Sequence, residues 1–247
     1  SGTAVAVEAS DLVLLDDNFS TVVTAIQEGR GVYANVQKFI CFLFSGNTGV
    51  VLAMFVGTIM AGIFNLRIGL QLLLPLTAAQ ILWMNLVTDG APAVAFSLGR
   101  TEADVMKEPP RAADTPILTR SLWVYVVSTG VIIGAMLLAT LDASYQGGWF
   151  TLGDHSVVLA RTMGFYVVVT SRLFNALNYR SLPHSLSVGF WRDFYVPGAC
   201  LLSWLMTLAI LYFPPTQQIF QVTSLSLQQL AILTGFSLFI LVPGEIL

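Results

Sequence analysis

The chain has 247 residues, of which 55% are hydrophobic and only 10% are charged, and its formal net charge is -3. A soluble protein would carry about a quarter charged residues, so this composition excludes an ordinary soluble domain. The small negative charge and the scarcity of lysine, found only at Lys38 and Lys107, exclude a basic nucleic-acid-binding surface. Several uncharged runs approach the ~20 residues needed to cross a bilayer, which predicts an integral membrane protein embedded in lipid.

The first 38 residues have the composition of a soluble protein. Asp11–Leu15 is a short apolar run beside acidic residues, which predicts a buried strand, and residues 16–20 supply turn and N-cap residues for a helix. From Thr21 to Lys38, apolar residues recur among charged ones at helical spacing. We therefore predict a soluble tail over 1–20 and an amphipathic stalk helix over 21–38 that continues into the membrane.

The hydropathy pattern predicts six transmembrane helices in residues 39–247. We place them near 39–63, 71–97, 121–141, 158–178, 194–213 and 229–247. Basic residues are concentrated in the connections 98–120 and 179–193. The positive-inside rule therefore places these two connections and both ends of the chain in the cytoplasm. The expected fold class is an all-α polytopic membrane protein, a six-helix bundle preceded by a short α/β tail.

The second predicted span contains a carboxylate, Asp89, which is the only charge between Ile68 and Gly99. A buried carboxylate in hydrocarbon is costly unless it is paired, solvated or neutralised. Asn85 and Thr88 precede Asp89 by four residues and one residue, so an α-helix would place all three on one face. Gly90 and Pro92 follow at once, and they would weaken the helix and free backbone carbonyls at the same depth.

Two functions are compatible with this polar cluster. Carboxylate, amide, hydroxyl and backbone oxygens together suit a hard cation such as Ca²⁺, and suit Mn²⁺ less well. The structural alternative is a set of hydrogen bonds that only holds helices together. The intramembrane acid and the helix-breaking residues favour cation binding.

A second polar cluster, Ser45-Gly-Asn-Thr-Gly49, lies in the first predicted span. Its glycines would allow two helices to approach closely, which is a structural role. Asn47 would instead add an oxygen ligand for the same cation. The sequence pattern alone does not separate these two roles.

Arg172 is a basic residue about two-thirds of the way along the predicted span 158–178. It would either extend its side chain to the lipid headgroups or place a fixed positive charge inside the bundle, facing Asp89. We favour the second role, because the reach to the cytoplasmic surface is long.

These features resemble the C-terminal part of the P-type cation-transporting ATPases, most closely the calcium-pump branch. The similarity runs over essentially the whole chain. The stretches that carry it are Ser1–Ser20, similar to the end of the phosphorylation domain; Glu28–Tyr33, similar to the stalk of the fifth family helix; Leu82–Gly90 (LWMNLVTDG), similar to the sixth; Val105–Arg111 (VMKEPPR), similar to the following loop; and Asn175–Asn178 (NALN), similar to the end of the eighth.

The resemblance implies that the six spans are the fifth to tenth helices of the family and that Asn47, Asn85, Thr88 and Asp89 are metal ligands. It also implies two departures from the two-site calcium pumps, because Val50 and Arg172 occupy the positions of two ligand glutamates. A guanidinium close to the position of a divalent ion is strongly repulsive in a low-dielectric bundle. We therefore expect a single Ca²⁺ site, with Arg172 as the counter-charge to Asp89 when the ion has left.

The family's Asp-Lys-Thr-Gly, Thr-Gly-Glu and Gly-Asp-Gly-X-Asn-Asp motifs do not occur in this sequence. The resemblance therefore implies that ATP and Mg²⁺ bind outside the chain and that none of its residues is catalytic. The expected partners are the transported cation, the bilayer, and an N-terminal half with actuator, nucleotide-binding and phosphorylation domains and four further helices. Alone, the chain is expected to hydrolyse no ATP. The expected location is a bacterial plasma membrane.

Two alternatives remain open from the sequence. One is a pump of the same family for another cation, Mn²⁺ or Na⁺/K⁺. The other is a secondary exchanger in which Asp89 and Arg172 form a proton-linked pair. Residues 1–20 and the 107–111 loop have no counterpart in that second class, which favours the ATPase.

Overall fold

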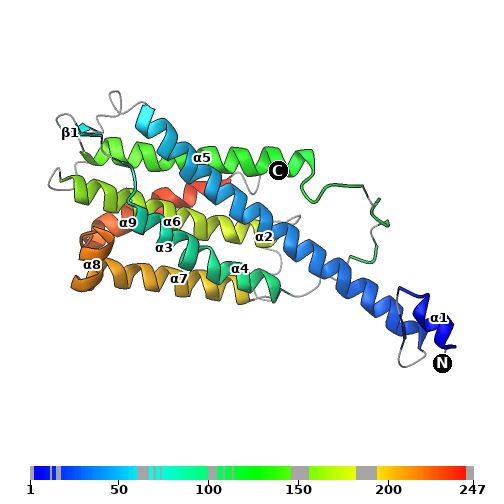
Figure 1. The fold of residues 1–247 in the computed structure, drawn as a ribbon. Coiled ribbons are helices and arrows are strands. Elements are labelled where there is room, and N and C mark those ends of the chain that lie inside the picture. The colour runs from blue at the N-terminus through cyan, green and yellow to red at the C-terminus, as the bar shows by residue number, and fades with distance from the viewer. Residues whose placement is uncertain are drawn as a thin grey trace.

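The computed structural model describes residues 3–11, 13–14, 18–59, 67–68, 71–72, 74–99, 105–107, 109–112, 114–145, 156–181 and 194–242. Most of these residues form helices that lie alongside one another in one elongated bundle (Figure 1). The bundle confirms the predicted all-α polytopic membrane fold. The predicted ends of the first and last spans, 60–63 and 243–247, and most of the basic connection 179–193 lie outside the described residues.

The chain begins with a short helix, α1 (Ala4–Glu8), whose N-cap Thr3 accepts a hydrogen bond from the Ala6 amide. The strand predicted over Asp11–Leu15 is not found in the described part of that run, because Val13 and Leu14 belong to no strand and Val13 is exposed. A short apolar segment becomes a buried strand only when a neighbouring strand or a core covers it.

Helix α2 (Phe19–Ile59) is one uninterrupted helix of 41 residues. It joins the predicted stalk to the first predicted span without a break. Its N-terminal half extends beyond the other helices toward α1, whereas its C-terminal half packs in the bundle (Figure 1). The stalk and the membrane part of α2 are therefore one continuous element.

The second predicted span, 71–97, is helical only from Ala78 onward and is not one regular α-helix. After the two-residue antiparallel pair of β1 (Arg67–Ile68) and β2 (Gln71–Leu72), it consists of α3 (Ala78–Trp83), the π-helix η1 (Met84–Thr88) and α4 (Gly90–Ser97). A capping box of Thr77 and Gln80 fixes the start of α3, where the Thr77 hydroxyl accepts from the Gln80 amide. The irregular segment lies at the polar cluster identified in the sequence.

The remaining helices are α5 (Arg120–Tyr145), α6 (Val157–Ser181), α7 (Tyr195–Tyr212), α8 (Pro214–Phe220), α9 (Leu227–Ser237) and the 3₁₀ turn η2 (Leu238–Leu241). Among the described residues, four helices, α2, α5, α6 and α7, are long and apolar enough to cross a membrane. The other two predicted spans are α3–η1–α4, which the π-helix interrupts, and the shorter apolar segment Leu227–Leu241. Helix α8 was not predicted.

Helices α2 and α5 touch through their backbones at glycines. A Cβ atom at Gly49 would lie 2.8 Å from the Gly130 carbonyl oxygen, and one at Gly134 would lie 2.9 Å from the Gly49 carbonyl oxygen. Both distances are too short for a side chain, so these glycines allow the close approach. The structural role considered for Gly49 is therefore confirmed.

Helix α6 is the most enclosed of the four long helices. Its Tyr166 hydroxyl pairs with the Thr234 hydroxyl of α9 at 2.8 Å and accepts from Trp204 Nε1 of α7 at 3.1 Å. These cross-helix hydrogen bonds fix the position of α6 in the bundle, and α6 carries Arg172.

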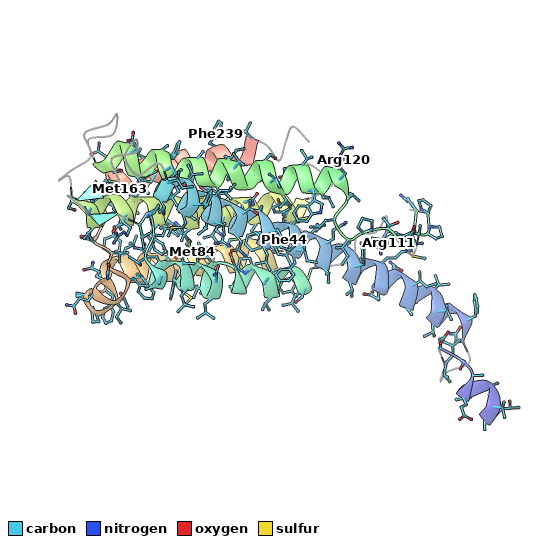
Figure 2. The ribbon with its side chains drawn as sticks, turned by 45° about the horizontal axis from the view of Figure 1, so that its top comes forward. Phe44, Met84, Arg111, Arg120, Met163 and Phe239 are labelled. Atoms are coloured by element: carbon cyan, nitrogen blue, oxygen red, sulfur yellow. The ribbon has the colours of Figure 1, made fainter. Side chains whose placement is uncertain are left out.

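The connection after α4 runs along the stalk half of α2. Asn35 Nδ2 donates to the Gly99 carbonyl at 2.8 Å, Arg30 Nη1 donates to the Val105 carbonyl at 2.7 Å, and the Arg111 guanidinium lies 4.3 Å from the centre of the Tyr33 ring. Figure 2 shows Arg111 and Arg120 at the end of the bundle from which the stalk projects, and Met163 near the opposite end.

Candidate cation site

The π-helix η1 determines where Asp89 lies. The Asp89 amide donates to the Met84 carbonyl, five residues earlier, at 2.9 Å. Three residues later, Pro92 has no amide hydrogen to donate to the carbonyls that precede it. The predicted weakening of the helix next to Gly90 and Pro92 is thus confirmed. It takes the form of a π-helical turn, a feature often found at functional sites.

Arg172 on α6 forms an ion pair with this carboxylate. Its Nη2 donates to Asp89 Oδ2 and also to Asn47 Oδ1 on α2, the latter at 3.1 Å. The Arg172 side chain is completely buried and Asp89 is 3% exposed. Arg172 therefore does not extend to the membrane surface, and it lies inside the bundle facing Asp89 as predicted.

A second polar contact lies one helical turn further along α6. Asn175 Nδ2 donates to the Ser45 hydroxyl at 2.9 Å, and that hydroxyl donates to the Phe42 carbonyl at 2.9 Å. Ser45 and Asn47 flank Gly46, so three consecutive residues of α2 face Arg172 or its neighbour Asn175. The 45–49 cluster thus has two roles, because Gly49 serves helix packing and residues 45–47 belong to the polar site.

The predicted ligands differ in how deeply they are buried. Thr88 is buried with Asp89, whereas Asn85 is exposed in this chain. The common face of the three residues stays a prediction. The i→i+5 hydrogen bonding of η1 differs from the α-helical geometry on which that prediction was based. Asn47 is also exposed, although its amide oxygen contacts Arg172.

Ser203 of α7 is a residue of the site that sequence reasoning missed. Its hydroxyl donates to the Val87 carbonyl of η1 at 3.1 Å. One turn further along α7, the Thr207 hydroxyl accepts from the indole nitrogen of Trp83 at 3.4 Å. The only sequence signal was the presence of two hydroxyls in an apolar span, which does not identify the helix that they contact.

Several polar atoms of the site are buried and have no hydrogen-bond partner among the described residues. They are Asp89 Oδ1, Thr88 Oγ1, and Arg172 Nε and Nη1. Buried polar atoms are normally satisfied, so each of these atoms has hydrogen-bonding capacity that the described residues do not use. No group of three or more His, Cys, Asp or Glu side chains that could hold a metal occurs in the described part of the chain.

An open apolar groove begins beside the site, between α2 and α3. Its lining consists of Val50, Val51, Met54, Phe55, Thr58, Ile59 and Ile81. Val50 is three residues beyond Asn47 on α2, and Ile81 is four residues before Asn85. The groove therefore begins about one helical turn from both asparagines.

One family model and three relatives among known proteins match this chain. A family model described as the C-terminus of cation-transporting ATPases matches residues 73–247. The chain is 37% identical to a calcium-transporting ATPase of Bacillus subtilis (strain 168), over 96% of this chain and 25% of that protein. It is 36% identical to calcium-transporting ATPase 1 of Bacillus cereus, over 100% of this chain and 28% of that protein. It is 33% identical to the rat calcium-transporting ATPase type 2C member 2, over 100% of this chain and 25% of that protein. The chain thus spans about a quarter of the length of these relatives.

Proposed function

The chain belongs to the cation-transporting ATPase family, and we propose that it is the C-terminal membrane part of an ATP-driven Ca²⁺ transporter with one Ca²⁺ site. The observation that carries the proposal is the buried Asp89 directly after a π-helix, paired with Arg172 and accompanied by unsatisfied polar atoms. The relatives named as calcium transporters support the choice of ion.

The ligands of the proposed site are Asp89, Thr88, Asn85 and Asn47. They would supply one carboxylate and three neutral oxygens, whereas Ca²⁺ takes six to eight oxygen ligands. The remaining ligands therefore come from water or from another part of the transporter. The exposed amides of Asn47 and Asn85 and the groove beside them face the space that such a part would fill.

The proposed stoichiometry of one follows from the charges. Arg172 brings a full positive charge into direct contact with Asp89. Val50 has no oxygen ligand and occupies the position of a ligand glutamate in the two-site calcium pumps that the chain resembles. A second divalent ion beside the guanidinium would be repelled in a low-dielectric environment without an acid to compensate. When the single ion leaves, Arg172 neutralises Asp89, so the site then needs no proton.

ATP and Mg²⁺ would bind outside this chain, in the part of the transporter that corresponds to the rest of the relatives' length. The chain's own residues would bind the ion, keep Asp89 compensated after the ion leaves and transmit movement through the stalk of α2. We also propose that both chain ends lie in the cytoplasm and that the transporter is located in a bacterial plasma membrane.

The test is the ion stoichiometry of the full-length transporter reconstituted in vesicles. We expect Ca²⁺-dependent ATP hydrolysis with one Ca²⁺ transported per ATP, and no transport by the Asp89→Asn variant. Two ions per ATP would refute the single-site proposal. Hydrolysis that depends on Mn²⁺ or Na⁺ but not on Ca²⁺ would refute the choice of ion, and unchanged transport by Asp89→Asn would refute the site.

A further inference from the structure

Gly46 lies directly against the guanidinium of Arg172. A Cβ atom built at Gly46 would lie 2.5 Å from Arg172 Nε and 2.8 Å from both Cζ and Nη2. These distances are well below van der Waals contact, so no residue other than glycine fits beside the guanidinium where it now lies. Gly46 is itself buried in α2, one residue before Asn47.

The close contact involves the charged end of a side chain and not a backbone. A side chain at Gly46 would therefore displace the guanidinium before it separated α2 from its neighbours. Because Nη2 is the atom that bonds both Asp89 and Asn47, that displacement would break the contacts of Arg172 with both side chains. At Gly49, by contrast, an added Cβ would meet the Gly130 carbonyl oxygen at 2.8 Å, so a substitution there would separate two helices.

We propose that Gly46 is a positioning residue for the cation site: its missing side chain is the space that lets Arg172 reach Asp89 and Asn47. One Nη2 atom bonds the side-chain oxygens of these two proposed ligands. An entering cation must displace this guanidinium, so the fit at Gly46 sets how strongly Arg172 competes with the ion. The effect of Gly46 on transport rests on the proposed function, whereas the contact between Gly46 and Arg172 is independent of that function.

The experiment is a double-mutant cycle in the full-length transporter, with Gly46→Ala, Arg172→Ala and both together. A cycle isolates the interaction between two residues in contact as the departure from additivity. We expect Gly46→Ala alone to tighten equilibrium Ca²⁺ binding by about tenfold, because the competitor is moved off Asp89 and Asn47. In the Arg172→Ala background, the added methyl group meets no guanidinium, and the same substitution should change binding by less than about twofold.

The second readout is the melting temperature without Ca²⁺, which does not depend on the identity of the ion. Gly46→Ala should lower it when Arg172 is present and should leave it unchanged or raise it slightly when Arg172 is absent. The matched control is Gly235→Ala in α9, where an added Cβ meets nothing within 4 Å. That substitution should be neutral in both backgrounds.

Equal effects of Gly46→Ala in the two backgrounds, in binding and in melting temperature, would overturn the role of Gly46. A wild-type transporter that binds no Ca²⁺ but shows the expected coupling in melting temperature would overturn the proposed function and leave the positioning role intact. The two failures are therefore distinguishable.

Discussion

At the scale of single residues, the ion pair of Asp89 and Arg172 dominates the interior. Both side chains are buried, and removing one partner of a buried pair leaves an uncompensated charge that costs about 3–5 kcal/mol. The identity of the two residues and their facing arrangement could be predicted, because charges are rare in membrane spans and need partners. The part played by Gly46 and Ser203 could not be predicted, because it depends on how α2, α6 and α7 are rotated about their axes.

The first prediction concerns Arg172→Ala. Without the guanidinium, the buried Asp89 carboxylate can be neutralised in the absence of Ca²⁺ only by taking up a proton. Protons and Ca²⁺ then compete for the same carboxylate, so Ca²⁺ affinity should fall more steeply with decreasing pH in the variant than in the wild type. The measurement is Ca²⁺ binding by the full-length protein across a pH series. Identical pH profiles would show that Arg172 is not the counter-charge of Asp89.

At the scale of elements, the existence and approximate ends of the helices followed from hydropathy and helical spacing. The internal geometry of α3–η1–α4 did not, because Gly90 and Pro92 signal an irregularity without specifying a π-turn. Thr88 and Asp89 are buried at this segment and Asn85 is exposed, a difference that the sequence pattern does not specify. Helix α8 was missed for a different reason, as a seven-residue helix carries too little periodicity to be seen.

The second prediction concerns the contact of α2 with α5. Gly134→Leu should force these helices apart, because even a Cβ atom there lies 2.9 Å from the Gly49 carbonyl oxygen. Overpacking of this kind costs about 1–3 kcal/mol, so the melting temperature of the full-length protein should fall. Gly198→Leu is the control, because an added Cβ at Gly198 meets nothing within 4 Å. Equal melting temperatures for the two variants would show that the glycine contact does not hold α2 to α5.

At the scale of the whole molecule, the chain is a bundle whose stalk extends from one end (Figure 1). The number of spans and the distribution of basic residues led to the proposed orientation, which the fold by itself does not determine. Which surface faces lipid and which faces the rest of the transporter also lies beyond the sequence. Exposed apolar side chains such as Leu82, Leu86 and Phe55 suit either environment.

The third prediction concerns this orientation. A protease site inserted in the 98–120 connection and a tag placed after Leu247 should both be accessible only from the cytoplasmic side, because basic connections stay in the cytoplasm. The measurement is cleavage and tag labelling in intact cells and in inside-out vesicles. A protease site inserted in the 142–157 connection, which has no lysine or arginine, is the control and should show the opposite accessibility. Cleavage of 98–120 in intact cells would reverse the proposed orientation.

The glycine contact between α2 and α5 has a consequence for how the site opens and closes. Two helices in backbone contact behave as one rigid body, so Asn47 cannot move away from α5 without breaking that packing. Segment η1, by contrast, has π-helical hydrogen bonding between two α-helices and is tied to α7 through the Ser203 hydroxyl. We therefore expect α2 and α5 to move together when the stalk moves, and the distance between Asn47 and Asp89 to change by bending at η1.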